Sequence, residues 1–197
     1  MHTYETKKFN LPSLEGISAK SVEEHLGLYA GYVKNFNALS KLIAELATSN
    51  WEKYSLAVAE LIRRRSFEFD GMRLHEYYFT QFEDGPKPPS AGELSSALLS
   101  DYGDGGGFER VMKQIGAMRG PGWVILYYDP EAKELLTSFV GEQHQGHFVT
   151  LPIILALDVW EHAFILDYGA QGKGKYIEAF FKNLNWDVME KRFAEVK

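Results

Sequence analysis

The chain has 197 residues, 45% of them hydrophobic, and carries a net charge of −6 with no cysteine. The lack of cysteine excludes disulfides, thiolate metal sites and cysteine nucleophiles. The acidic balance argues against nucleic acid as a partner, and the sequence has no run of about 18 apolar residues that could cross a membrane.

The first part of the chain predicts a helical hairpin domain over residues 1–86. Residues 1–15 lack the apolar core of a secretory signal, so we expect a cytoplasmic protein. Apolar residues then recur at helical spacing in three stretches, one from near residue 18 and two over about 51–64 and 71–82. Three prolines within 83–91 stop the helical pattern, which sets the domain boundary at residue 86.

The second part, residues 87–197, changes its hydrophobic period. Short helices are expected over about 91–99 and 108–118, followed by strand-like runs at 123–128, 135–140 and 152–157. Helices return over about 160–168, 176–184 and 187–196. The order predicts an α+β protein: an N-terminal helical hairpin, then a C-terminal domain with a three-stranded antiparallel sheet flanked by helices.

Asp158 and His162 are the first candidates for chemistry. Asp158 ends a fully apolar strand, and a carboxylate buried there is costly unless it is paired or bound to a metal. His162 follows four residues later and is expected on the same side of the chain. A carboxylate and an imidazole that converge suit a divalent first-row metal, although buried Asp-His pairs also occur without one.

His25 and His75 lie inside apolar helical segments, where a single histidine is usually a core residue. Together with Asp158 and His162 they would form a set of three nitrogens and one oxygen without sulfur. Such a set suits manganese or iron and leaves room for a further ligand. Zinc hydrolases use similar ligands, so the set alone does not specify redox chemistry.

The segment Asp158-Val159-Trp160-Glu161-His162-Ala163-Phe164 resembles the signature of the iron/manganese superoxide dismutases. Similar matches cover nearly the whole chain and include Gly120 to Trp123, Tyr32 to Asn37, Leu74 to Phe79, Tyr176 to Phe180, and Asn185-Trp186. The resemblance implies an enzyme that converts superoxide to dioxygen and hydrogen peroxide. It does so by alternately reducing and oxidising one manganese or iron ion per chain.

The resemblance also implies roles for individual residues. The metal ligands would be His25, His75, Asp158 and His162, placed between the two domains. Tyr32 would be the gateway tyrosine, and the pocket would be walled by Trp123, Trp160 and Tyr78. Glu161 would pair with His162 of a second subunit, which implies a homodimer, with a tetramer also possible.

A glutamine beyond the ligands is expected to tune the metal together with Tyr32. In iron-type members it lies four residues before the second histidine ligand, where this chain has Gly71. In manganese-type members it precedes the third strand, where Gln143 is the best match. Its close rivals are His144, Gln145 and His147. This pattern favours manganese.

Some positions depart from the family pattern. Tyr32 follows His25 by seven residues instead of eight, yet seven helical steps return to within about 20° of the start. The family's hydrogen-bonded gateway pair of histidine and tyrosine is not expected here, where Ile165 replaces the tyrosine. Candidates for steering the superoxide anion are Lys34, Lys173 and Lys175.

Two other functions stay open. A member of the same fold can be a non-catalytic structural or metal-binding subunit, although such proteins typically lose ligands. A metal-dependent hydrolase or oxygenase could use the same four ligands.

Overall fold

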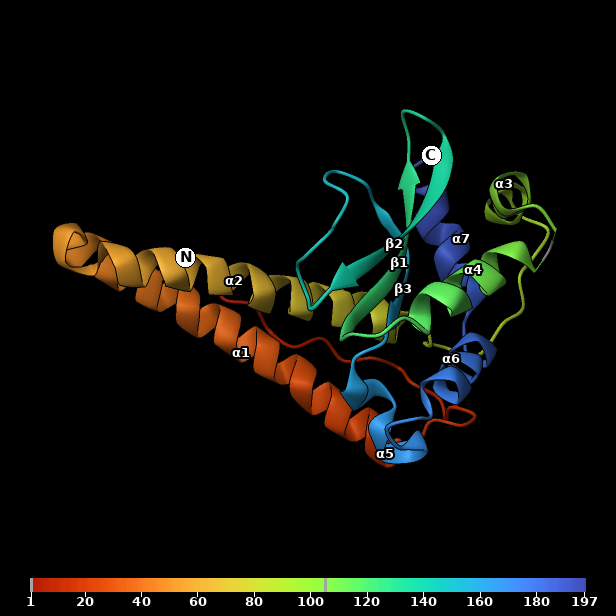
Figure 1. Ribbon diagram of the computed structural model, residues 1–197, viewed down its shortest axis with the longest axis horizontal. Helices are drawn as coiled ribbons and strands as arrows, with labels where there is room; N and C mark the ends of the chain where they lie inside the picture. Colours follow the sequence, from red (N-terminus) through yellow and green to blue (C-terminus); the bar gives the residue numbers. More distant parts are fainter. Residues whose placement is uncertain (1, 105) are drawn as a thin grey trace.

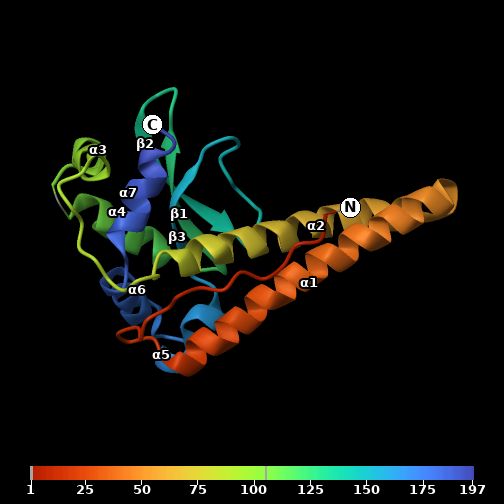
Figure 2. The ribbon, with the colours of Figure 1, turned by 180° about the vertical axis from the view of Figure 1, so that it is seen from behind.

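Two long helices, α1 (Ala19–Ser49) and α2 (Trp51–Thr80), form an antiparallel hairpin in the computed structural model, which describes residues 2–104 and 106–197. Only Asn50 separates them, and its side chain caps α2 by accepting a hydrogen bond from the backbone nitrogen of Lys53. The helices meet at the tip of a long arm and spread apart toward the rest of the molecule (Figure 1). The N-terminal segment runs along this arm (Figure 2).

The structure joins the two helices predicted over 51–64 and 71–82 into the single helix α2. Residues 65–70 contain neither proline nor glycine, so nothing in them stops the helix. At Gly71 an added Cβ would lie only 2.6 Å from Cδ1 of the Tyr32 ring on α1. This glycine therefore allows a close approach between the two helices and does not break α2.

Three antiparallel strands form the sheet in the order β2-β1-β3: β1 (Gly122–Asp129), β2 (Glu134–Gly141) and β3 (Ile153–Asp158). The central strand β1 is buried almost throughout, and β3 is buried on both faces as its apolar run predicts. Trp123 of β1 pairs with Val140 of β2 and with Asp158 of β3. The register therefore places Trp123 and Asp158 side by side at one end of the sheet.

The remaining helices pack around this sheet (Figure 1). They are α3 (Glu93–Tyr102), α4 (Gly107–Gly116), α6 (Lys173–Lys182) and α7 (Trp186–Ala194), with the short turns η1 (Glu161–Ala163) and α5 (Ile165–Tyr168) after β3. The helix predicted over 160–168 is thus two short pieces, because Phe164 at φ −136° interrupts it. The predicted α+β architecture is confirmed.

The sheet is fastened to the wide end of the helical arm. Gln81, which follows α2 directly, accepts a hydrogen bond from the backbone nitrogen of Ala156 (2.8 Å) and donates one to its carbonyl (2.9 Å). These bonds hold β3 beside the C-terminal half of α2, and the chain then turns into η1 next to α1. Among the helices of the described residues, none has an apolar stretch long enough to span a bilayer.

Candidate metal centre

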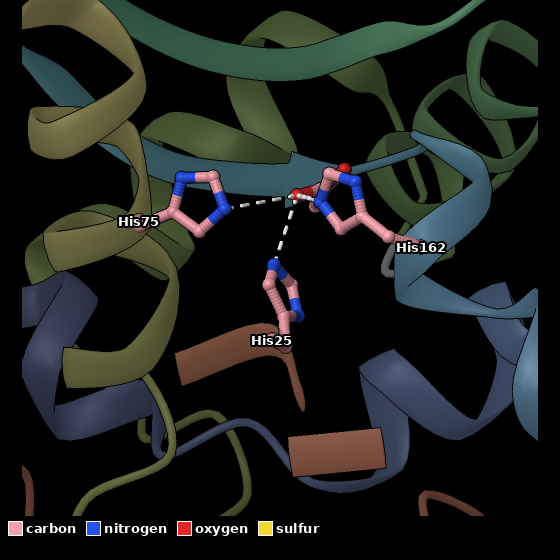
Figure 3. A group of neighbouring side chains, drawn as sticks. His25, His75 and His162 are labelled. Atoms are coloured by element: carbon pink, nitrogen blue, oxygen red, sulfur yellow. Dashed lines mark hydrogen bonds and ion pairs between the residues drawn. The ribbon is translucent and has the colours of Figure 1, made fainter. Parts of the chain in front are cut away.

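Four side chains from four elements meet where α1 and α2 spread apart. His25 comes from α1, His75 from α2, Asp158 from the end of β3, and His162 from η1. One ligand atom from each lies within 4.8 Å of all the others. Figure 3 shows the three imidazoles pointing toward one another across the space between the elements.

The three histidine Nε2 atoms converge on one carboxylate oxygen. Asp158 Oδ2 lies 3.1 Å from His162 Nε2, 3.2 Å from His25 Nε2 and 3.9 Å from His75 Nε2 (Figure 3). The side chains of His75 and Asp158 are fully buried, and that of His162 is 21% exposed. The centre is thus enclosed but reached by solvent from the His162 side.

The turn after β3 fixes the orientation of Asp158. Its second oxygen, Oδ1, accepts a hydrogen bond from the backbone nitrogen of Trp160 at 2.8 Å. This local bond is the kind that aspartate side chains form at the start of a turn. It leaves Oδ2 directed at the imidazoles and brings His162, four residues on, back to the same site.

Burial and charge set the protonation of these groups. Burial lowers the pKa of His75 to about 3, and the nearby His25 adds to this shift. Burial also lowers the pKa of His25. Burial alone would raise the pKa of Asp158, but the charge of His162 and its hydrogen bond lower this pKa below its ordinary value. At neutral pH the site therefore offers a carboxylate and neutral imidazoles in His25 and His75.

His75 shows that this arrangement fits a cation. Its Nδ1 lies 2.6 Å from the carbonyl oxygen of Gly71, an acceptor, so Nδ1 carries the proton and Nε2 bears a lone pair. Within residues 2–104 and 106–197, this buried Nε2 has no hydrogen-bond partner. A buried lone pair without a partner is costly, and a metal ion is the natural group to occupy it. Three imidazole nitrogens and one carboxylate suit manganese or iron.

Gln143 lies in the loop after β2 and is fully buried. Its Oε1 accepts a hydrogen bond from Trp123 Nε1 (2.7 Å), and its Nε2 donates to Tyr32 Oη (2.8 Å). The Tyr32 ring in turn contacts the His75 ring, with centroids 5.0 Å apart. Burial, followed by the charge of Asp158, raises the pKa of Tyr32 to about 12.

The rivals of Gln143 lie elsewhere. Gln145 is exposed, and the His144 ring packs against Phe67 with centroids 5.6 Å apart. His147 turns toward Tyr127 on β1. The iron-type position at Gly71 has no space for a glutamine, because the Tyr32 ring fills it. The structure therefore brings Gln143, and none of these three rivals, to Tyr32.

Aromatic rings wall the centre. The Trp123 ring lies 5.2 Å from the His75 ring, Trp160 stacks on His162 at 5.9 Å, and Tyr78 lies 4.8 Å from His25. Sequence analysis missed Phe79, whose ring lies 5.0 Å from that of His25. Its position four residues after His75 was the available signal, because residues at that spacing share a helix face. No role was predicted for Tyr176, which donates a hydrogen bond to Tyr78 Oη (3.2 Å), although it begins the family match over Tyr176 to Phe180.

A cleft of about 360 Å³ opens beside His25 and His162. Leu28 and Ile165 line it and are 41% and 45% exposed. Ile165 is the residue that takes the place of the family's gateway tyrosine in the sequence, and it lines this cleft. Glu161, on the same turn as His162, is exposed.

The three lysines considered for steering differ in environment. Lys34 and Lys175 are exposed. Lys173 is half-buried, and its Nζ donates a hydrogen bond to the carbonyl of Met118 at 2.7 Å. Burial lowers the pKa of Lys173.

The sequence is similar to those of known superoxide dismutases. The family profile described as "Iron/manganese superoxide dismutases, C-terminal domain" matches residues 90–192. The iron superoxide dismutase of Aquifex pyrophilus is 33% identical over 206 aligned positions, which cover 99% of this chain and 93% of that protein. The iron superoxide dismutase of Saccharolobus solfataricus is 30% identical, with coverage of 96% and 95%. A manganese superoxide dismutase of Halobacterium salinarum is 36% identical over 123 positions, 61% of each chain.

Proposed function

Since this chain belongs to the iron/manganese superoxide dismutase family, we propose that it converts two superoxide anions and two protons into dioxygen and hydrogen peroxide. One observation carries the proposal: four ligand atoms from separate elements lie within 4.8 Å of one another. A redox metal held by His25, His75, Asp158 and His162 would supply the one-electron oxidation and reduction, which the side chains cannot perform.

The metal would be manganese or iron. The place of Gln143 in the loop after β2 supports the manganese that the sequence analysis favours. The relatives from Aquifex pyrophilus and Saccharolobus solfataricus are named for iron, so they give the manganese preference no support. The donor set suits both metals.

Tyr32 and Gln143 would tune the metal through a chain of hydrogen bonds. Tyr32 Oη accepts the hydrogen bond of Gln143 Nε2, so the hydroxyl hydrogen of Tyr32 is free to be donated within the centre. A pKa of about 12 keeps that hydrogen on Tyr32 at neutral pH. The indole nitrogen of Trp123 can only donate, so its bond to Gln143 Oε1 fixes which way the amide points.

The rings of Trp123, Trp160 and Tyr78 would keep the centre dry. All three lie within 6 Å of a ligand imidazole by ring centroid. In such a low-dielectric site, the carboxylate and the hydrogen-bond donors act more strongly on charge than they would in water. The same rings also contribute to the hydrophobic core.

A homodimer, or a tetramer built from dimers, is part of this proposal. Glu161 is exposed beside His162, as a residue that bridges to a second subunit must be. Leu28, Ile165 and Leu166 are exposed apolar side chains around the same cleft, which a second copy would cover.

Two further parts of the proposal concern the whole chain. We propose that the boundary between its two domains lies between residues 86 and 87. We also propose that the protein is cytoplasmic.

Two alternatives carry less support. A purely structural member of the fold has no need of four converging ligands, and a metal-binding member without activity is the outcome that the reloading experiment below would reveal. A hydrolase needs a general base beside its metal. The groups nearest to the ligands are instead Tyr32, whose pKa is about 12, and the neutral amide of Gln143.

The test is to strip the purified protein of metal, reload it separately with manganese and with iron, and assay superoxide dismutation. Activity with one metal identifies that metal as the cofactor, and activity with both shows that either serves. Stoichiometric uptake of both metals without activity would overturn the proposal.

A further inference from the structure

We propose that His147 is a positioning residue: it holds the loop between β2 and β3 so that the amide of Gln143 reaches Tyr32 and Trp123. The inference rests on the proposed function, because Gln143 has a role in the reaction only if the centre is redox-active. It concerns a histidine that does not touch the ligands and that acts through the backbone of Gln143.

The imidazole of His147 bridges a core strand and the loop. Its Nε2 lies 3.0 Å from the carbonyl oxygen of Gln143, and its Nδ1 lies 2.7 Å from Tyr127 Oη. Tyr127 belongs to the central strand β1 and is only 1% exposed, so it is a fixed anchor. The histidine therefore ties the backbone of Gln143 to the central strand of the sheet.

The chemistry of the two partners assigns the hydrogen atoms. A carbonyl oxygen can only accept, so Nε2 of His147 must carry a hydrogen and donate it to Gln143. In the neutral ring, Nδ1 then accepts the hydroxyl hydrogen of Tyr127. If His147 is protonated, Nε2 still donates to the same carbonyl, so the bond that positions Gln143 does not depend on the charge of the ring.

The loop needs such external bonds. Glu142 has φ +52°, a left-handed conformation that costs free energy for a residue other than glycine. Its carbonyl accepts a hydrogen bond from Trp160 Nε1 at 3.2 Å. Two successive carbonyls, those of Glu142 and Gln143, are thus held by Trp160 and His147. Removing the second bond would release the carbonyl of Gln143, while the backbone bonds between Gly141 and Gln145 on either side of it would remain.

His144 offers a matched control in the same loop. It follows Gln143 directly, but its Nδ1 lies 3.9 Å from Glu142 Oε2, beyond hydrogen-bonding distance. Its ring packs against Phe67 and makes no bond to the Gln143 backbone. A histidine of the same loop that does not hold the carbonyl of Gln143 is therefore available for comparison.

The test uses the metal-loaded, full-length protein in four variants. His147→Ala removes both bonds, and Tyr127→Phe removes only the anchoring hydroxyl. His147→Gln keeps a side-chain N–H near the former Nε2. His144→Ala is the control. For each variant we would measure metal content, kcat and KM separately, the reduction potential of the bound metal, and a crystal structure.

We expect His147→Ala to lower kcat about tenfold with unchanged metal content, as is typical for partners beyond the ligands. Its reduction potential should shift, and Gln143 Nε2 should move out of hydrogen-bonding distance from Tyr32 Oη. The kcat of Tyr127→Phe should lie between that of His147→Ala and that of the parent. His147→Gln should restore kcat to within about threefold, and His144→Ala should match the parent.

Two outcomes would overturn the proposal. One is a His147→Ala protein with a lower melting temperature but the parent's kcat, potential and Gln143 position. The other is a loss of activity that follows loss of metal. The proposed function fails separately: an inactive parent would refute dismutation, while the position of Gln143 in the His147→Ala crystal structure would still decide the role of His147.

Discussion

The side-chain amide of Gln143 donates a hydrogen bond of 2.8 Å to the hydroxyl of Tyr32, across 111 residues of sequence. Tyr32 comes from the helical arm and Gln143 from the loop after β2, so the bond joins the two parts of the molecule beside the ligands. Because Tyr32 Oη accepts this bond, its own hydrogen remains available for donation. The position of this loop therefore helps to set the position of the Tyr32 hydroxyl.

Shortening Gln143 should separate this pair without disturbing the ligands. Gln143→Asn is expected to lower kcat by about 10- to 100-fold, because the amide can no longer bond both Tyr32 and Trp123. Metal content should not change. The matched control is Gln145→Asn, an exposed glutamine of the same loop, which should keep the parent's kcat. Equal kcat values in the two variants would show that Gln143 has no part in turnover.

Removing one ligand should empty the site. His75→Ala deletes the buried Nε2 that has no hydrogen-bond partner within the described chain. Metal content per chain after reloading should fall at least about tenfold by mass spectrometry of the digested protein. His2→Ala, which changes an exposed histidine, should bind as much metal as the parent. Full metal content in His75→Ala would exclude this residue as a ligand.

Gly71 should resist substitution because of Tyr32. A Cβ at this position would lie 2.6 Å from the Tyr32 ring, so Gly71→Ala should destabilise the protein by about 1–3 kcal/mol in urea unfolding. Gly31→Ala on α1 meets no atom of the described chain within 4 Å. It should stabilise the protein by about 1 kcal/mol through helix propensity. Equal effects of the two substitutions would contradict the close packing of Tyr32 on α2.

The fold was largely predictable because its signals are local. The apolar run at 152–157 predicted a strand, and β3 is buried on both faces there. The predictions for two segments were wrong, and each error has a physical reason. The single helix α2 passes through Gly71, where packing against Tyr32 outweighs the propensity of glycine to break a helix. The helix after Asp158 is split at Phe164.

The site was predictable only in part. Asp158 and His162 could be predicted as site residues because they follow an apolar strand in the sequence. The convergence of His25 and His75 on them depends on tertiary packing, which no local pattern shows. Sequence alone left Gln143 with three rivals, since one loop offers four polar side chains in five residues. The hydrogen bonds to Tyr32 and Trp123 separate it from them, and no local pattern encodes those bonds.

The pKa of His75 gives a pH dependence of stability in the metal-free protein. Burial lowers this pKa from 6.5 to about 3, so between these values the unfolded chain binds a proton that the folded chain excludes. Stability should therefore fall as the pH drops from about 6.5 toward 3. Urea unfolding of the metal-free protein at about pH 7 and pH 5 measures the fall, to which His75 contributes at most about 2 kcal/mol.

The matched variant for this experiment is His75→Gln, which keeps a polar side chain but does not titrate in that range. Its loss of stability between the two pH values should be smaller than that of the parent. An equal loss in both proteins would assign the effect to other groups, such as His25, whose pKa burial also lowers.

We propose that four converging side chains hold a metal that disproportionates superoxide. The most direct test follows the decay of superoxide by stopped-flow absorbance after mixing with a much smaller amount of reloaded protein. We expect many turnovers per metal ion, with kcat/KM approaching the diffusional range of about 10⁸–10⁹ M⁻¹s⁻¹. No acceleration beyond that of the His75→Ala protein, despite one metal ion bound per parent chain, would contradict it.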